Sequence, residues 1–152
     1  MSERNLIKFK PIGVIHTPLT DGAFTPIQSA RSDIDGVVEV FAEFTDGLQG
    51  LEGFSHIYLI YCFFSMGDEL SLKVTPFLDD QEQGVFATRF PLRPNPIGFS
   101  VVKLIRIDNA LLYFKGADML DGTLLLDIKP YLPDFDVFQV EKIGWFSNRS
   151  KA

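Results

Sequence analysis

Two segments of this sequence concentrate the side chains that could do chemistry. The first, residues 84–98, carries Arg89, Arg93 and Asn95 among three prolines. Proline fixes its own φ and biases the residue before it toward extended conformations, so a stiff, irregular connection is expected. Guanidinium groups suit planar carboxylates or phosphates, and on a stiff frame they lose little conformational freedom when they bind. The residues alone leave two interpretations open, a rigid corner of the fold and an anion-binding site.

The second segment, residues 116–133, places a carboxylate in an otherwise apolar run. Asp127 follows three leucines, and Lys129 lies two residues further on, on the same side of an extended chain. Burying an unpaired carboxylate is costly, so Asp127 needs a partner and Lys129 can supply it. The two residues form either a strand-edge ion pair or part of a site that also includes the Tyr131 hydroxyl.

Several familiar motifs do not occur in the sequence. The glycine-rich stretch at residues 47–53 does not match G-x-G-x-x-G, and neither a P-loop nor G-x-S-x-G is found. His16 and His56 are far apart and there is one cysteine, so neither a zinc ribbon nor an internal disulfide is expected. The sequence therefore argues against Rossmann, P-loop and α/β-hydrolase chemistry, and no metal is predicted.

Length and charge narrow the class of protein further. A chain of 152 residues, 46% hydrophobic and 22% charged, is typical of one soluble globular domain. Its 14 basic and 20 acidic residues give a net charge of −6, which argues against a broad nucleic-acid-binding surface. However, no acid occurs between Glu82 and Asp108, a window with four Lys or Arg residues. This window is either a local anion site or a chance gap.

No segment is predicted to enter a membrane. No apolar run approaches the ~18 residues of a spanning helix, and the N-terminus lacks the apolar core of a signal peptide. No membrane partner and a cytoplasmic location are therefore expected.

Short strands dominate the predicted secondary structure. Residues 36–44 alternate between apolar and polar side chains, whereas residues 56–64 are too apolar to alternate and predict a strand buried on both faces. Asp-Asn and Asp-Gly pairs predict turns at residues 108–109 and 121–122. The other expected elements are strands at 98–107, 111–114 and 123–129 and one helical turn at 46–51. Together they favour an antiparallel barrel or a compact sandwich.

Two motifs carry a resemblance to a known family. The runs R-P-N-P-I-G at residues 93–98 and D-I-K-P-Y at 127–131 closely resemble the two signatures of the TsaA-like (YaeB/TrmO) family. The resemblance extends to residues 11–18, 26–28 and 53–56, and so covers nearly the whole chain.

The resemblance implies a fold and an activity. The expected fold is all-β with minor α, a small single-sheeted antiparallel β-barrel over residues 1–140, with a C-terminal tail over 141–152. The expected activity is that of an S-adenosylmethionine-dependent methyltransferase, usually a homodimer. Characterised members methylate N6 of threonylcarbamoyladenosine, which lies beside the anticodon of certain tRNAs.

The chemistry of methyl transfer suggests catalytic and substrate-binding residues, and the resemblance implies the residues that bind the cofactor. Asp127, Lys129 and Tyr131 are expected to orient the nucleophilic nitrogen and help to accept its proton. Arg93 and Asn95 are expected to bind the substrate. The expected cofactor-binding residues are Pro26, Ile27, Gln28, Phe64, Ser65, Arg89, Phe99, Gly116, Ala117 and Asp118.

Three functions remain open from the sequence. The net charge is −6, and the chain lacks the C-terminal extension of longer members. The methyl acceptor is therefore either tRNA or a small molecule. The first function is therefore a tRNA methyltransferase, and the second is a small-molecule methyltransferase. The third is a non-catalytic module that binds S-adenosylmethionine.

Overall fold

The computed structural model describes residues 5–20, 32–63, 71–76 and 79–148. Contacts divide the chain into two compact units. The first unit combines residues 1–62 with 99–131, and the second combines residues 63–98 with 132–152. The domain expected over residues 1–140, with its tail over 141–152, stays a prediction.

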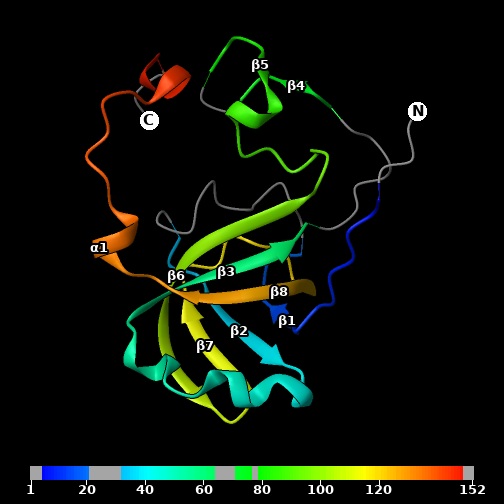
Figure 1. The fold of residues 1–152 in the computed structure, drawn as a ribbon, viewed down its shortest axis with the longest axis vertical. Helices are drawn as coiled ribbons and strands as arrows, with labels where there is room; N and C mark the ends of the chain where they lie inside the picture. The colour runs from blue at the N-terminus through cyan, green and yellow to red at the C-terminus, as the bar shows by residue number, and fades with distance from the viewer. Residues whose placement is uncertain (1–4, 21–31, 64–70, 77–78, 149–152) are drawn as a thin grey trace. The chain divides into compact units, whose positions relative to one another are not determined.

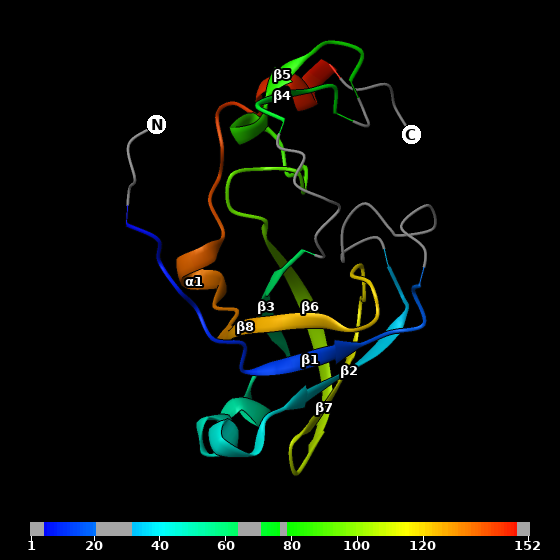
Figure 2. The same ribbon diagram turned by 90° about the vertical axis from the view of Figure 1, so that its right-hand side faces the viewer.

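The first unit is a closed barrel of six strands, in the order β1-β2-β7-β6-β3-β8 around its wall (Figures 1 and 2). Strand β8 pairs antiparallel with both β1 and β3, and these pairings complete the closure. The expected all-β class and the small antiparallel barrel are thus confirmed. The strands are β1 (Gly13–His16), β2 (Asp35–Val40), β3 (His56–Cys62), β6 (Ile97–Asp108), β7 (Leu111–Lys115) and β8 (Thr123–Pro130).

The barrel interior is filled by side chains that alternate along the strands. In β2, Val38 and Val40 are buried, while Glu39 between them is exposed. In β7, Leu112 and Phe114 are buried in the same alternating way. Because successive side chains of a strand point to opposite faces, every second residue enters the core.

Strand β3 differs from its prediction. Ile57, Leu59 and Tyr61 are buried, but His56 is exposed and Tyr58 is only partly buried. The prediction of a strand buried on both faces is therefore wrong. A closed barrel has a single interior, so one face of every strand must lie outside it.

Strand β2 is also shorter than predicted. It ends at Val40, and a 3₁₀ helix follows over Ala42–Leu48, with a second at Leu51–Gly53. The partner strand explains this end, since Glu39 pairs with Leu111, the first residue of β7. Beyond that point β7 has no strand residue left to pair. The amides of Val40 and Phe41 still donate to the carbonyls of Ala110 and Ile12. Local bonding begins with the Phe44 amide, which donates to the Phe41 carbonyl.

The two predicted turns are confirmed. Asn109, between β6 and β7, has a φ of 53°, and Gly122, before β8, has a φ of 82°. Glycine adopts this left-handed region without strain, and asparagine tolerates it better than most residues. Asn109 therefore allows the tight reversal between the paired strands β6 and β7. The turn at Gly122 is not a hairpin, because it leads into β8, which pairs with β1 and β3 and not with β7.

The second unit contains little regular structure. Its elements are β4 (Lys73–Val74), β5 (Gln83–Gly84), a 3₁₀ helix (Val85–Ala87), α1 (Pro133–Asp136) and a 3₁₀ helix (Gly144–Asn148). Trp145 donates a hydrogen bond from Nε1 to the Ala87 carbonyl at 2.6 Å, and its ring meets that of Phe146 edge-on. This contact joins the C-terminal segment to the turn that precedes Arg89.

In the described part of the chain, no helix has the length and apolar character that crossing a membrane requires.

We predict that Gly36→Ala destabilises the barrel. Gly36 lies opposite Phe114 in the β2–β7 register, and a Cβ at Gly36 would overlap the Phe114 ring. That ring is fully buried and has little room to move, so the free energy of unfolding should fall by about 1–3 kcal/mol. Urea denaturation measures the change. Gly47→Ala is the matched control, since nothing lies within 4 Å of its Cβ position, and equal losses in the two variants would contradict the prediction.

Candidate functional site

The proline-rich loop is held by hydrogen bonds of its own. Arg93 donates from Nη1 to the carbonyls of Thr88 at 2.8 Å and Phe90 at 3.2 Å. The Thr88 hydroxyl donates to the Val85 carbonyl at 2.8 Å and accepts from the Phe90 amide at 3.3 Å. Residues 88–96 form neither helix nor strand, as the three prolines predict. One arginine thus ties together the loop that carries Arg89.

The candidate ligand-binding residues of this loop differ in exposure. Arg89 and Asn95 are exposed, whereas Arg93 is half-buried against its own loop. The role of Arg93 in substrate binding stays a prediction, since its Nη1 is already engaged by two carbonyls. All three residues belong to the second unit, whereas the candidates described next belong to the barrel.

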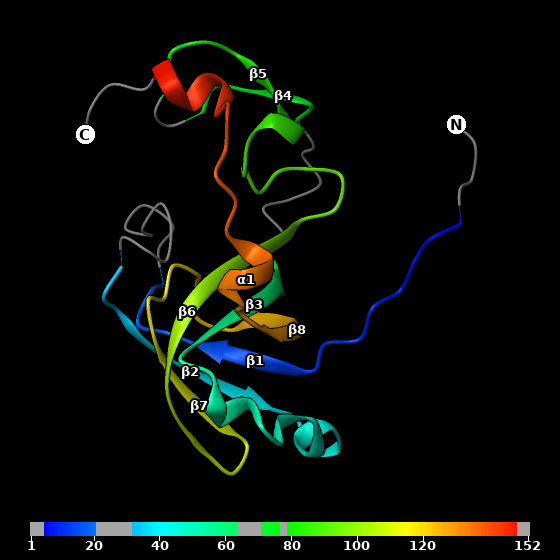
Figure 3. The ribbon, with the colours of Figure 1, turned by 60° about the vertical axis from the view of Figure 1, so that its left-hand side comes forward.

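An acid and a lysine are paired on the outside of the barrel. The Lys129 ammonium lies 3.2 Å from Oδ2 of Asp127, and both side chains are about half exposed. Lys129 lies opposite Tyr58 on β3, and Asp127 lies opposite Ile60. Figure 3 shows β3 between β6 and β8. The Asp127–Lys129 ion pair on β8 therefore lies next to β3.

A β-bulge in β8 turns Asp127 outward. Ile60 pairs with Asp127, but the next residue of β3, Tyr61, pairs with Leu125, so Leu126 is an extra residue in β8. Without it, Asp127 would share the face of Leu125, which is fully buried. The extra residue shifts the alternation by one position, and the carboxylate reaches the outer face.

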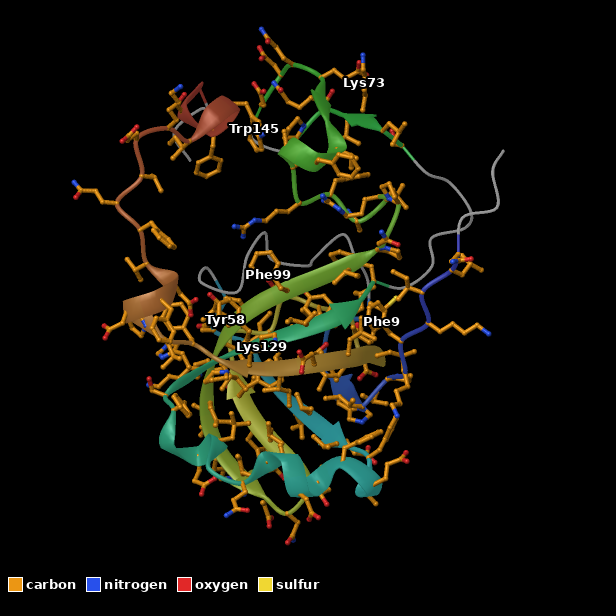
Figure 4. All side chains as sticks on the ribbon, in the orientation of Figure 1. Phe9, Tyr58, Lys73, Phe99, Lys129 and Trp145 are labelled. Atoms are coloured by element: carbon orange, nitrogen blue, oxygen red, sulfur yellow. The ribbon has the colours of Figure 1, made fainter. Side chains whose placement is uncertain are left out.

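Aromatic side chains lie on the strands beside this pair and just after β8. The ring of Tyr131 lies 5.7 Å from that of Tyr58 and 6.4 Å from that of His56, and Tyr58 lies 6.4 Å from Phe99. Figure 4 shows Tyr58, Phe99 and Lys129 close together on β3, β6 and β8. The barrel thus brings residues that are distant in sequence to one outer face.

The segment that follows β7 is fixed by its backbone. The amides of Gly116 and Ala117 both donate to the Ile34 carbonyl at 2.9 Å, and the Ser32 hydroxyl donates to the Ala117 carbonyl at 2.6 Å. Gly116 has a φ of 106°, a conformation that favours glycine. Gly116 and Ala117 are buried, so the partly exposed Asp118 is the member of this trio that can meet a ligand.

Asp118 is also held by the Ser100 hydroxyl, which is in turn bonded to a buried tyrosine. Oδ1 of Asp118 accepts a hydrogen bond of 2.6 Å from Ser100, and the Ser100 oxygen lies 2.9 Å from the buried Tyr61 hydroxyl. Burial, together with the negative charge of Asp118, raises the pKa of Tyr61 above its usual value, although the Ser100 hydrogen bond opposes the shift. Tyr61 therefore remains protonated at neutral pH.

Sequence reasoning missed four residues of these clusters, namely His56, Tyr58, Tyr61 and Ser100. Ser100 had a usable signal, because it shares the face of Val102 and Leu104 and a buried hydroxyl needs a partner. The two tyrosines had no comparable signal in the sequence, because the residues around them in β3 are mostly apolar and no alternating pattern is visible.

The remaining candidates cannot be placed. Five predicted cofactor-binding residues lie outside the described residues, namely Pro26, Ile27, Gln28, Phe64 and Ser65. Among the described residues, no group of three or more His, Cys, Asp and Glu side chains is placed to hold a metal ion.

These features define a small antiparallel β-barrel with an acid, a lysine and aromatic rings on one outer face, joined to a proline-rich loop unit. The family model described as the tRNA-methyltransferase O N-terminal domain matches residues 14–137, and the chain belongs to this family. The expected resemblance is therefore confirmed.

Three relatives illustrate the similarity. A probable S-adenosyl-L-methionine-binding protein of Pyrococcus abyssi is 51% identical over 141 residues, which are 92% of this chain and 76% of that protein. The tRNA (adenine(37)-N6)-methyltransferase of Mus musculus is 36% identical over 135 residues, 84% of this chain and 31% of that enzyme. A crystal structure of TrmO from Pseudomonas aeruginosa has a TM-score of 0.75 at 33% identity and covers 92% of this chain. The chain spans 62% of that TrmO chain, so it corresponds to part of the longer enzymes.

We predict that Arg93→Ala loosens the proline-rich loop. Loss of the two carbonyl contacts should speed amide hydrogen exchange over residues 88–95, since fewer bonds then hold the loop closed. Hydrogen exchange with mass spectrometry measures this.

The variant Arg93→Lys distinguishes a role of Arg93 in holding the loop from a role in binding the substrate. Its ammonium can still donate to two carbonyls from one nitrogen, but it cannot replace a bidentate guanidinium. Slow exchange in Arg93→Lys is expected, and unchanged exchange in Arg93→Ala would contradict the structural role.

Proposed function

We propose that this protein is an S-adenosylmethionine-dependent methyltransferase that methylates N6 of threonylcarbamoyladenosine next to the anticodon of tRNA. The observation that carries the proposal is the outer face on which Asp127, Lys129 and Tyr131 meet Tyr58 and Phe99. The names of the mammalian relatives support tRNA adenine as the acceptor.

The described residues suit the cofactor. The Asp118 carboxylate is a fixed acceptor for a hydroxyl or an amine, and Phe99, 46% exposed, offers an apolar ring. The exposed Arg89 guanidinium matches the cofactor carboxylate. Gly116 and Ala117 would serve the cofactor through the buried backbone turn that presents Asp118. Pro26, Ile27, Gln28, Phe64 and Ser65 stay the other proposed cofactor-binding residues.

The catalytic roles follow from the Asp127–Lys129 pair. When bound, S-adenosylmethionine would supply a methyl group on its sulfonium sulfur, which the acceptor nitrogen would take in line while S-adenosylhomocysteine leaves as a neutral thioether. Positioning supplies much of the rate in such a reaction. The nitrogen must lose one proton as it gains the methyl group, and Asp127 would accept that proton. Lys129 holds the carboxylate in place, and the Tyr131 hydroxyl would orient the nitrogen.

Three basic side chains on β6 and β7 support an anionic partner. Lys103 lies opposite Lys115 in the β6–β7 register, although like charges in opposed positions destabilise a sheet. Arg106 lies 3.8 Å above the Tyr113 ring. These cations, with Arg89, could neutralise the RNA backbone locally in a chain whose net charge is −6.

A non-catalytic module is the second candidate. The observation that favours it is the name of the Pyrococcus abyssi relative, a probable S-adenosyl-L-methionine-binding protein. A module of this kind predicts binding of the cofactor without methyl transfer to RNA. A small-molecule methyltransferase would instead transfer the methyl group without any need for RNA.

A homodimer is part of the proposal. Within the second unit, apolar side chains are exposed along one segment, namely Phe135, Val137, Phe138, Val140 and Ile143. Concentrated apolar exposure marks interaction surfaces, and a second copy of the chain is the proposed partner. A cytoplasmic location, where tRNA is modified, is proposed with it.

We predict that Lys129→Ala slows methyl transfer by about 10²- to 10⁴-fold, because the Asp127 carboxylate that accepts the proton is then no longer held in place. Cofactor binding should not weaken. Arg89→Ala should instead abolish binding of S-adenosylmethionine in calorimetry. Methyl incorporation into tRNA from cells that lack the enzyme measures turnover. Lys8→Ala is the matched control, because it removes an exposed lysine to which no role in binding or catalysis is assigned.

Full turnover in Lys129→Ala would refute its catalytic role. Cofactor binding by the wild type without incorporation into tRNA or small acceptors would favour the non-catalytic module.

We predict that Phe138→Asp converts a wild-type dimer to a monomer, because a carboxylate cannot be buried unpaired at an apolar contact. Light scattering after size exclusion measures the mass. Gln139→Asp, which adds the same charge at the neighbouring exposed position, should remain dimeric. A monomeric wild type would contradict the homodimer.

A further inference from the structure

Two buried hydroxyls and one carboxylate form a hydrogen-bonded chain in the barrel, from Tyr61 through Ser100 to Asp118. Tyr61 on β3 and Ser100 on β6 are 4% and 2% exposed, and their oxygens are 2.9 Å apart. The Ser100 oxygen lies 2.6 Å from Oδ1 of Asp118, which follows β7. Three separate segments of the chain therefore contribute to one connected network.

The chemistry of the three groups sets the direction of these hydrogen bonds. An ionised carboxylate only accepts, so the Ser100 hydroxyl donates its single proton to Asp118. Ser100 then has only lone pairs to offer Tyr61, and the Tyr61 hydroxyl must donate. The raised pKa of Tyr61 is consistent with this, because the group stays protonated.

Nothing in the packing alone calls for two hydroxyls at these positions. Phenylalanine and alanine would fill the same part of the wall without a polar group to satisfy. The hydroxyls instead restrict a side chain whose backbone is already held by the Ile34 carbonyl through Gly116 and Ala117. Asp118 is thus fixed at its main chain and at its carboxylate.

We infer that Tyr61 and Ser100 are positioning residues that hold the Asp118 carboxylate ready to accept a hydrogen bond from S-adenosylmethionine. The inference rests on the proposed cofactor. The donor would be a ribose hydroxyl or the amine of the amino-acid part, which share the chemistry that a fixed carboxylate recognises. A carboxylate fixed in advance loses less freedom on binding, so the affinity should depend on both hydroxyls.

A double-mutant cycle in cofactor affinity tests the inference. Calorimetry with S-adenosylmethionine compares the wild type, Ser100→Ala, Tyr61→Phe and the double variant. Ser100→Ala should raise Kd by about tenfold or more, since it removes a hydrogen bond to a charged group. Tyr61→Phe should raise Kd by a smaller factor, and it should add nothing in the Ser100→Ala background, because Tyr61 acts through Ser100.

Two controls separate positioning from stability. Tyr113→Phe removes a hydroxyl from the same barrel without contact to Ser100, and its Kd should equal that of the wild type. Tyr61→Phe keeps the ring that fills the core, so its thermal midpoint should stay close to the wild-type value. Repeating the titrations with 5′-methylthioadenosine, which lacks the amino-acid part, identifies the donor. An effect of Ser100→Ala that persists points to the ribose, and one that disappears points to the amine.

The possible failures are distinguishable. If the wild type binds S-adenosylmethionine but Ser100→Ala and Tyr61→Phe bind it equally well, the positioning role is overturned and the proposed function stands. Additive effects of the two substitutions would also overturn it, since independent effects exclude a relay. If the wild type binds no S-adenosylmethionine, the proposed cofactor fails and this inference fails with it.

Discussion

The pairing of β8 with both β1 and β3 is the constraint on which the rest of the barrel depends. It gives every strand of the wall two neighbours, so no edge is left with unpaired amides and carbonyls. Closure also leaves one interior, which is filled by residues such as Ile57, Leu59 and Leu125. The opposite face of the same strands is then available for polar and aromatic side chains. The candidate catalytic face is this outer surface.

The bulge at Leu126 allows one strand to contribute both to the core and to the outer face. On one side of it Leu125 packs in the interior, and on the other side Asp127 and Lys129 reach the outside. An ion pair that is half exposed contributes little to stability, because water screens it. Its place in an otherwise apolar strand is what the proposed catalytic role would explain. Tyr58 lies next to both Tyr131 and Phe99 on the same outer face.

Asp118 belongs to a different environment from Asp127. Asp118 is restrained by the Ser100 hydroxyl, which is in turn bonded to that of Tyr61, and the two residues before Asp118 are bonded through their amides to the Ile34 carbonyl. Asp127 is restrained by an exposed ammonium. Two carboxylates with such different surroundings suit two different tasks, holding a ligand and exchanging a proton. The loop that carries Arg89 has its own restraint, since Arg93 gathers two of its carbonyls.

Much of the protein follows from the sequence alone. Alternation predicts the core face of β2, Asn109 and Gly122 predict the turns, and the R-P-N-P-I-G and D-I-K-P-Y motifs predict the family. These signals are local, because they depend on residues a few positions apart. Closure, the bulge and the relay from Tyr61 to Asp118 are not local. Each depends on which strands become neighbours, and the same leucine run could place Asp127 inside or outside. Only the tertiary pairing of β8 with β3 decided that question, because a one-residue shift in register moves a side chain to the opposite face.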